Sequence, residues 1–161
     1  MDLDQLRARL EMADFAGREQ LSLEVAASAS QDELKQIARL LTASSDRVRL
    51  GAIEILGAAA FRPALRLLLA VASKRDGTER IFAARATVRV ANPGDVELLG
   101  STAETWAASE ESLLRVHGQA LLHKLGVTGD GSERWKKAVA AVPAGASPAA
   151  LTFGLTSPDP A

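Results

Sequence analysis

The sequence contains no cysteine and no tyrosine, and aromatic residues make up only 4% of its 161 residues. Without cysteine the chain forms no disulfide bond, has no thiolate nucleophile and offers no thiolate ligand to a metal ion. Aromatic and β-branched residues, which favour strands, are scarce, whereas alanine, leucine and arginine, which favour helices, are abundant. These scarcities predict an all-α protein.

The sequence has almost no excess of positive or negative charge, since its formal net charge at pH 7 is −1. A chain with so little net charge has no strong positive field to attract nucleic acids without selectivity. The longest apolar run, LRLLLAVA over 65–72, includes Arg66 and is too short to span a bilayer. The first residues, MDLDQLRARLEM, are acidic and mixed rather than basic and then apolar. We therefore expect no secretory signal, no membrane partner and a cytoplasmic location.

Helical periodicity accounts for most of the chain up to residue 142. Leucines recur at helical spacing over 3–11, a second helix is predicted around 17–28, and Ser30 and Glu33 form a capping box that starts a third. The remaining helices are predicted to begin near residues 46, 63, 78, 93 and 110, with a short last helix over 133–142. From residue 143 proline, alanine, glycine and serine dominate, so 143–161 is predicted to be a separate, loose tail.

Arginine recurs at one position of the second helix in successive helix pairs. Arg49, Arg80 and Arg115 are spaced 31 and then 35 residues apart. A small residue follows each arginine three residues later, which lets a neighbouring helix approach closely; these residues are Ala52, Ala83 and Gly118. An interval of this size predicts stacked helix pairs, each of which buries one face against its neighbours.

The stretch DRVRLGAIEILG over 46–57 carries the most specific pattern. An aspartate, a Val-Arg pair, a small pair and a closing Leu-Gly stand at Asp46, Val48, Arg49, Ala52, Ile53, Leu56 and Gly57. This pattern resembles the second helix of the short bacterial HEAT repeats. The resemblance implies a right-handed α-solenoid of about four helix pairs plus a short terminal helix, occupying 1–142. It also implies that Asp46 lies in the turn between paired helices and that Arg49 joins neighbouring repeats in a polar ladder, while Arg47 faces solvent.

Residues that could support catalysis are few. His117 and His123 are six residues apart, about 240° around a helix, so they do not share a metal ion. The adjacent Glu110 and Glu111 point apart and supply the negative charge that is favoured at a helix start. Asp130 begins an Asp-Gly-Ser turn that lacks the remaining ligands of a calcium loop. We therefore expect no enzyme activity, no cofactor, no metal site and no small-molecule substrate.

The second helices of such a solenoid line its concave surface, where their basic residues are candidates for a strip that binds a partner. The candidates are Arg47, Arg80, Arg85, Arg89, Arg115 and His117, with Glu54 and Lys124 as charges at the rim. Arg85 and Arg89 share a helix face because they are four residues apart. In the alternative interpretation, Arg49, Arg80 and Arg115 are used in hydrogen bonds between repeats, and the surface is mixed and solvated.

An apolar segment, LTFGL over 151–155, interrupts the polar composition of the tail. An apolar segment of this kind can dock on a partner or on its own protein. We therefore predict that Leu151, Phe153 and Leu155 dock, either on a partner or on the last helix, which they would then cap.

Together these features predict a non-catalytic scaffold or adaptor that presents a concave helical surface to a protein or an acidic peptide. Two alternatives stay open: a nucleic-acid-binding protein whose second-helix arginines contact phosphates, and a subunit of a larger assembly. The near-neutral net charge disfavours the first alternative. If the protein bound nucleic acid, its affinity would fall steeply with added salt, and this would distinguish it from a protein-binding scaffold.

Overall fold

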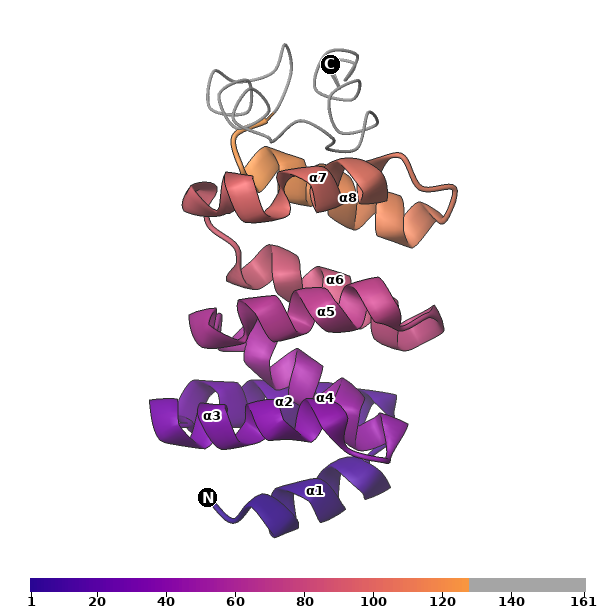
Figure 1. Cartoon of the computed structure of the whole chain (residues 1–161). Coiled ribbons are helices and arrows are strands. Elements are labelled where there is room, and N and C mark those ends of the chain that lie inside the picture. The colour runs from indigo at the N-terminus through magenta and orange to yellow at the C-terminus, as the bar shows by residue number, and fades with distance from the viewer. Residues whose placement is uncertain (128–161) are drawn as a thin grey trace. The chain divides into compact units, whose positions relative to one another are not determined.

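The computed structural model describes residues 1–127, and this part of the chain contains eight α-helices and no strand (Figure 1). The helices are α1 (Leu3–Met12), α2 (Phe15–Ser28), α3 (Gln31–Arg39), α4 (Asp46–Ala58), α5 (Leu65–Lys74), α6 (Gly77–Val90), α7 (Val96–Ala107) and α8 (Ser112–Lys124). Short 3₁₀ turns cover Leu40–Thr42, Arg62–Ala64 and Pro93–Asp95. The all-α prediction is confirmed, and no described helix combines the length and the apolar character needed to cross a membrane.

The chain divides into two compact units, Met1–Val90 and Ala91–Ala161. The first unit contains α1 to α6, and the described part of the second contains α7 and α8. The predicted helix over 133–142 and the predicted tail over 143–161, with its apolar segment 151–155, lie outside the described residues.

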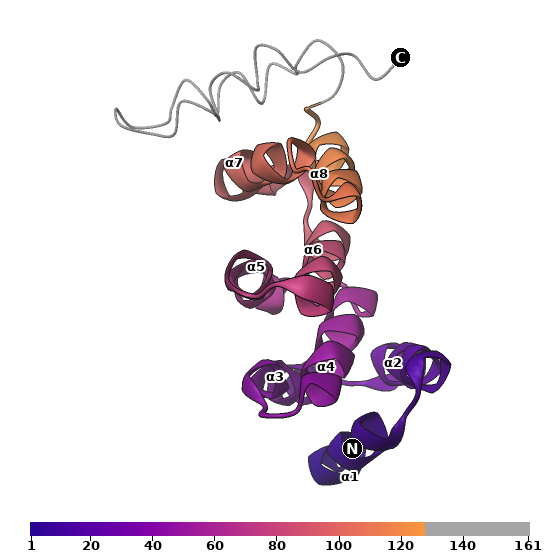
Figure 2. The ribbon, with the colours of Figure 1, turned by 90° about the vertical axis from the view of Figure 1, so that its right-hand side faces the viewer.

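Two layers of helices form most of the first unit. Helices α4 and α6 lie in one layer and α3 and α5 in the other, and α2 lies beside α4 on the side away from α3 (Figure 2). The hairpins α3–α4 and α5–α6 connect the layers, and α4 also contacts α2 and α6. Helix α1 packs against α4, where the side chain of Leu10 fills the space beside Gly51.

Helix α4 is the central element of this unit because it is apolar around most of its circumference. Val48, Ala52, Ile53, Ile55 and Leu56 are each no more than 3% exposed. They contact neighbours on several sides, which include α1, α2, α3 and α6. A helix surrounded in this way has no wide polar face, so its apolar residues are not confined to a single stripe.

Helices α4 and α6 run in the same direction. Arg49 near the start of α4 bonds to Glu79 near the start of α6, and further along Gly57 lies against Ala86. A Cβ added to Gly57 would lie 2.9 Å from the Cβ of Ala86. The glycine therefore permits the close approach of the two helices.

Local sequence signals set several helix ends. The predicted capping box is confirmed, because Ser30 Oγ accepts from the amide of Glu33 at 3.2 Å and the Glu33 carboxylate accepts from the amide of Ser30 at 2.8 Å. The Glu33 carboxylate also accepts from the Met1 ammonium at 2.6 Å, and these bonds lower its pKa to about 2, with the Met1 bond as the largest cause. Asn92 and Asp95 form a second reciprocal cap ahead of α7.

The described part of the second unit is a tight hairpin of α7 and α8. Trp106, Leu114, Leu121 and Leu122 are buried in it. Gly118 lies so close to α7 that an added Cβ would be 2.2 Å from the backbone nitrogen of Ala107. Only a residue without a side chain fits this helix crossing.

Candidate functional site

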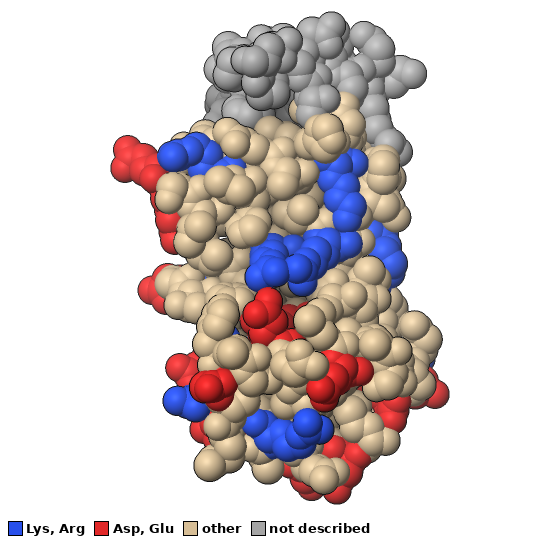
Figure 3. All heavy atoms as spheres, turned by 180° about the vertical axis from the view of Figure 1, so that it is seen from behind, with Lys and Arg blue, Asp and Glu red and all other residues tan. Residues whose placement is uncertain are grey.

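Residues of α2, α4 and α6 line a groove. Its lining includes Glu19 and Leu23 of α2, Gly57 and Ala58 of α4, and Arg85 and Arg89 of α6. The groove, called the α2–α6 groove below, has a cavity volume of about 40 Å³. Figure 3 shows this side of the molecule, where basic and acidic side chains lie next to each other around a hollow.

At one end of the groove, the lining residue Phe82 belongs to a stack of aromatic and arginine side chains. The rings of Phe15 and Phe82 meet edge to face with their centroids 6.5 Å apart. The guanidinium of Arg18 lies 5.4 Å from the Phe15 ring centroid and 5.7 Å from that of Phe82. Cation–π attraction and the ring–ring contact therefore hold α2 against α6 at this end.

The carboxylate of Glu54 is neutralised inside the groove. Arg18 Nε donates to it at 3.0 Å and Ser22 Oγ donates to it at 3.4 Å. The Arg18 and Glu54 side chains are only 9% and 13% exposed, so this pair is shielded from solvent. A shielded, hydrogen-bonded pair fixes both side chains in place and contributes little net charge to the surface.

The α6 wall of the groove is basic. Arg85 is half-buried and Arg89 is exposed, and they are one helical turn apart on the same face. Partial desolvation of its guanidinium, followed by repulsion from Arg85, lowers the pKa of Arg89 from its usual value, while Glu19 and Glu54 act in the opposite direction. Arg89 is therefore influenced both by the arginine beside it and by two carboxylates of the groove.

Of the six residues predicted to form a basic strip, the structure places Arg85 and Arg89 together in the groove. Arg80 is half-buried on α6, and Arg115 and His117 belong to α8 of the second unit. The two predicted rim charges belong to different units: Glu54 lines the groove of the first, and Lys124 belongs to α8 of the second.

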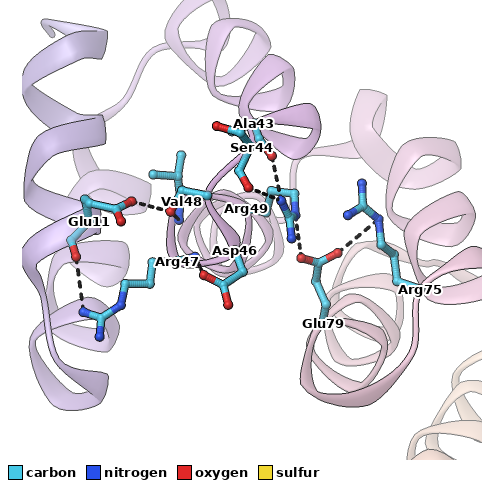
Figure 4. Close-up of polar contacts among 10 residues, drawn as sticks. Glu11, Ala43, Ser44, Asp46, Arg47, Val48, Arg49, Arg75 and Glu79 are labelled. Carbon is cyan, nitrogen blue, oxygen red and sulfur yellow. Dashed lines mark hydrogen bonds and ion pairs between the residues drawn. The ribbon is translucent and has the colours of Figure 1, made fainter.

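Arg47 is exposed, but its guanidinium is engaged at the end of α1 (Figure 4). Its Nη1 donates to the backbone carbonyls of Glu11 at 3.2 Å and Ala13 at 3.3 Å. The Glu11 carboxylate in turn accepts from the hydroxyl of Ser45. Arg47 therefore satisfies carbonyls that the helix end leaves without a partner.

Arg49 connects α4 to both its own turn and the next hairpin (Figure 4). Its Nη1 donates to the carbonyls of Ala43 at 2.7 Å and Ser44 at 2.9 Å. Its Nε donates to Glu79 Oε1 at 2.6 Å, and Arg75 Nε lies 3.1 Å from the other Glu79 oxygen. Glu79 is only 8% exposed, so this carboxylate depends on the two arginines for compensation.

Asp46, which the resemblance placed in the turn between paired helices, is the first residue of α4 and serves its own helix. Its carboxylate accepts from the amide of Arg47 at 2.8 Å at the start of α4. The acceptor that α6 offers to Arg49 is Glu79. The HEAT pattern marks Asp46 and Arg49, but it does not mark Glu79.

Several residues of the groove were not singled out from the sequence. Phe15, Arg18 and Phe82 come from two helices far apart in the chain, and Glu54 was assigned only to the rim. The one sequence signal available was the recurrence of an Arg–Glu pair about one repeat apart, since 36 residues separate Arg18 from Glu54. The meeting of Phe15 with Phe82 has no local signature.

No cluster of three or more histidine, aspartate and glutamate side chains in residues 1–127 could hold a metal ion. Comparisons of the chain with family models, with curated proteins and with solved structures found no match.

Proposed function

We propose that the chain is a non-catalytic protein-binding scaffold of the HEAT-like α-solenoid type, with about four helix pairs and a short terminal helix. The hairpins α3–α4, α5–α6 and α7–α8 support the repeat assignment. A shared arginine also supports it: Arg49 of α4 and Arg115 of α8 each donate to a backbone carbonyl in the turn before their own helix.

The α2–α6 groove is the observation that carries the proposal. The Arg18–Glu54 pair and the Phe15–Phe82 contact join α2 to α4 and to α6 beside the groove. Leu23 on its wall is 53% exposed, and Phe15 at its end is 61% exposed. A preformed surface with exposed apolar and arginine side chains binds a protein with little loss of conformational entropy.

Site-specific photo-crosslinking tests this function with a matched control. A photoreactive amino acid replaces Leu23, which lies at the groove, or Leu67, which lies on α5 in the other layer. The two leucines are similarly exposed, at 53% and 49%. Irradiation in extract of the source cells is expected to yield a nuclease-resistant protein adduct at position 23 and none at position 67. Adducts at position 67 alone, or at neither position, would contradict binding through this face.

Charge reversal adds a second test of the same face. The double variant R85E/R89E is expected to abolish the adduct at position 23. The control R39E/R66E makes the same charge change on exposed arginines of α3 and α5 and is expected to leave the adduct intact. Equal loss in both variants would show a general effect of net charge instead of recognition at the groove.

The alternative function, binding of nucleic-acid phosphates, draws support from the Arg85–Arg89 pair. The carboxylates of Glu19 and Glu54 in the same groove oppose it. The salt dependence of binding separates the two functions, because each neutralised phosphate adds to the slope of affinity against salt concentration. A nuclease-sensitive partner with a steep slope would favour the alternative.

A further inference from the structure

Two exposed apolar side chains stand one helical turn apart on α8. Leu113 is 58% exposed and Val116 is 55% exposed, and the exposed Ala120 continues the same side of the helix one turn further. Among the large apolar side chains exposed in residues 1–127, only this pair is one turn apart on one helix. Leu113, Val116 and Ala120 define an apolar surface, called the α8 face below.

The α8 face carries no charge. The other exposed positions of α8 as far as Ala120 are Ser112 and Gln119. Leu67 of the first unit, by contrast, directly follows the exposed Arg66. A contiguous apolar surface without charged neighbours is suited to an apolar occupant that is itself uncharged.

The segment LTFGL over 151–155 has the matching chemistry. It lies within residues 143–158, which include no charged residue. Its three apolar residues, Leu151, Phe153 and Leu155, alternate with smaller or more polar ones. In an extended conformation, this alternation directs all three to one side, so that the segment offers a single apolar edge to a helix face.

The chain between α8 and this segment is long enough to bring the two together. It passes back against the hairpin at the end of α8, since Val127 is 3% exposed and its amide donates to the carbonyl of Leu122 at 2.8 Å. Leu113 lies about 21 Å along the helix from this end. Residues 128–150 reach as far as about 80 Å when extended. Such a tether raises the effective concentration of the segment at the face, which favours docking within the chain over docking of a second molecule.

We propose that the segment 151–155 docks on the α8 face of its own chain, with the ring of Phe153 against Leu113 and Val116. The face and the segment belong to the same unit, Ala91–Ala161. The α2–α6 groove belongs to the other unit, so this inference does not rest on the proposed protein-binding function and can fail without it.

Intramolecular photo-crosslinking of the full chain tests the docking. The photoreactive residue benzoylphenylalanine replaces Phe153 or, as the matched control, Ala144, which belongs to the same tail but not to the apolar segment. Mass spectrometry of the irradiated monomer is expected to find about fivefold more adduct in the α8 peptide, or a greater excess, from position 153 than from position 144. Equal yields, or adducts that join two chains, would overturn the proposal.

Methyl NMR spectra provide a second measurement that leaves α8 unaltered. A docked phenyl ring shifts the resonances of the methyl groups that lie against it. F153A is therefore expected to move the methyl resonances of Leu113 and Val116 and to leave those of Leu67, which is 49% exposed on α5, unchanged. Unchanged resonances at both positions of α8 would overturn the docking.

A charge placed on the α8 face tests the surface itself. V116D is expected to lower the crosslink from position 153 about fivefold or more, because docking would bury the new carboxylate without a partner. The control S101D adds the same charge at an exposed position of α7 and is expected to preserve the crosslink. A crosslink that survives V116D would overturn the proposal. Circular dichroism melting checks that each variant folds, and F153A keeps the proposal testable if V116D does not.

Discussion

Helices α4 and α8 are built alike at a fixed offset of 66 residues, yet they differ in what their arginine reaches. Arg49 Nη1 donates to the carbonyl of Ala43, and Arg115 Nη1 donates to the carbonyl of Ser109, in both cases six residues earlier. Arg49 also bonds to Glu79 of the following hairpin. The arginine thus closes its own hairpin in both units, and the first unit adds to this a link between hairpins.

The ends of the two helices are also alike. The amide of Phe61 donates to the carbonyl of Leu56 at 3.0 Å, and the amide of Val127 donates to that of Leu122 at 2.8 Å. The residue before each of these amides has positive φ, with Ala60 at 49° and Gly126 at 78°. This is the arrangement of a Schellman motif, and only α8 has the glycine that suits it. Both hairpins therefore share the bond from arginine to its own turn and the backbone arrangement at the helix end. The bond to Glu79 is particular to Arg49, and the glycine at the helix end is particular to α8.

Substitution of Arg49 is expected to have the largest effect on this comparison. R49A removes the bonds to the turn and leaves the buried Glu79 carboxylate with Arg75 alone. We expect a loss of about 3 kcal/mol in the free energy of unfolding of the first unit. Hydrogen exchange with mass spectrometry measures the loss in peptides from α4 and α6. The control is R39A, at an exposed position of α3. A loss below that of R115A would show that the Glu79 link contributes nothing.

The second prediction concerns the helix crossing at Gly118. In G118A the new methyl group would be 2.2 Å from the backbone nitrogen of Ala107, so the helices must separate. We expect a net loss of about 2 kcal/mol, after allowing for the better helix propensity of alanine. Urea denaturation followed by circular dichroism measures it.

G51A is the matched control for this substitution. The three atoms nearest to its added methyl group all belong to the side chain of Leu10, which can adjust more readily than backbone. We expect it to change stability by less than G118A does. An equal effect of the two substitutions would mean that contact with backbone is not what makes the crossing at Gly118 tight.

Substitution of Arg115 is expected to have a smaller effect than that of Arg49. R115A removes the bond to the carbonyl of Ser109 and disturbs no ion pair that the described structure assigns to Arg115. We expect a loss of about 1 kcal/mol, observed as faster hydrogen exchange in the peptides of α7 and α8. An effect as large as that of R49A would show that Arg115 has a partner comparable to Glu79.

How much the sequence could predict depends on how far apart the interacting residues are. The caps at Ser30 and Asn92 were predictable because their partners are three residues away, and helical periodicity placed most of the helices. The bond from Arg49 to its own turn is nearly as local. Its bond to Glu79 crosses 30 residues, and no pattern marked that glutamate.

The groove was harder to predict for the same reason. The pair Arg85 and Arg89 was recognisable from its spacing on one helix. Arg47, two residues from Arg49, was assigned to the same basic strip, although its guanidinium lies on the carbonyls at the end of α1. Which way an exposed arginine turns depends on neighbours brought close by the fold. Only local spacing can be inferred from one sequence.

The smallest expected effect concerns the two helix ends, and it has opposite signs in the two units. Ala60 has a φ of 49°, a conformation that costs an alanine about 1–2 kcal/mol. Glycine avoids this strain but loses more backbone entropy on folding, so the substitution recovers only part of the cost. We expect A60G to stabilise the first unit by about 0.5 kcal/mol and G126A to destabilise the second by about 1 kcal/mol. Urea denaturation of both single variants measures these changes, with A59G, one residue before the positive φ, as the control. Destabilisation by A60G would mean that the methyl group of Ala60 makes a contact worth more than the strain. In that case the ends of α4 and α8 would be alike in backbone conformation and different in what stabilises them.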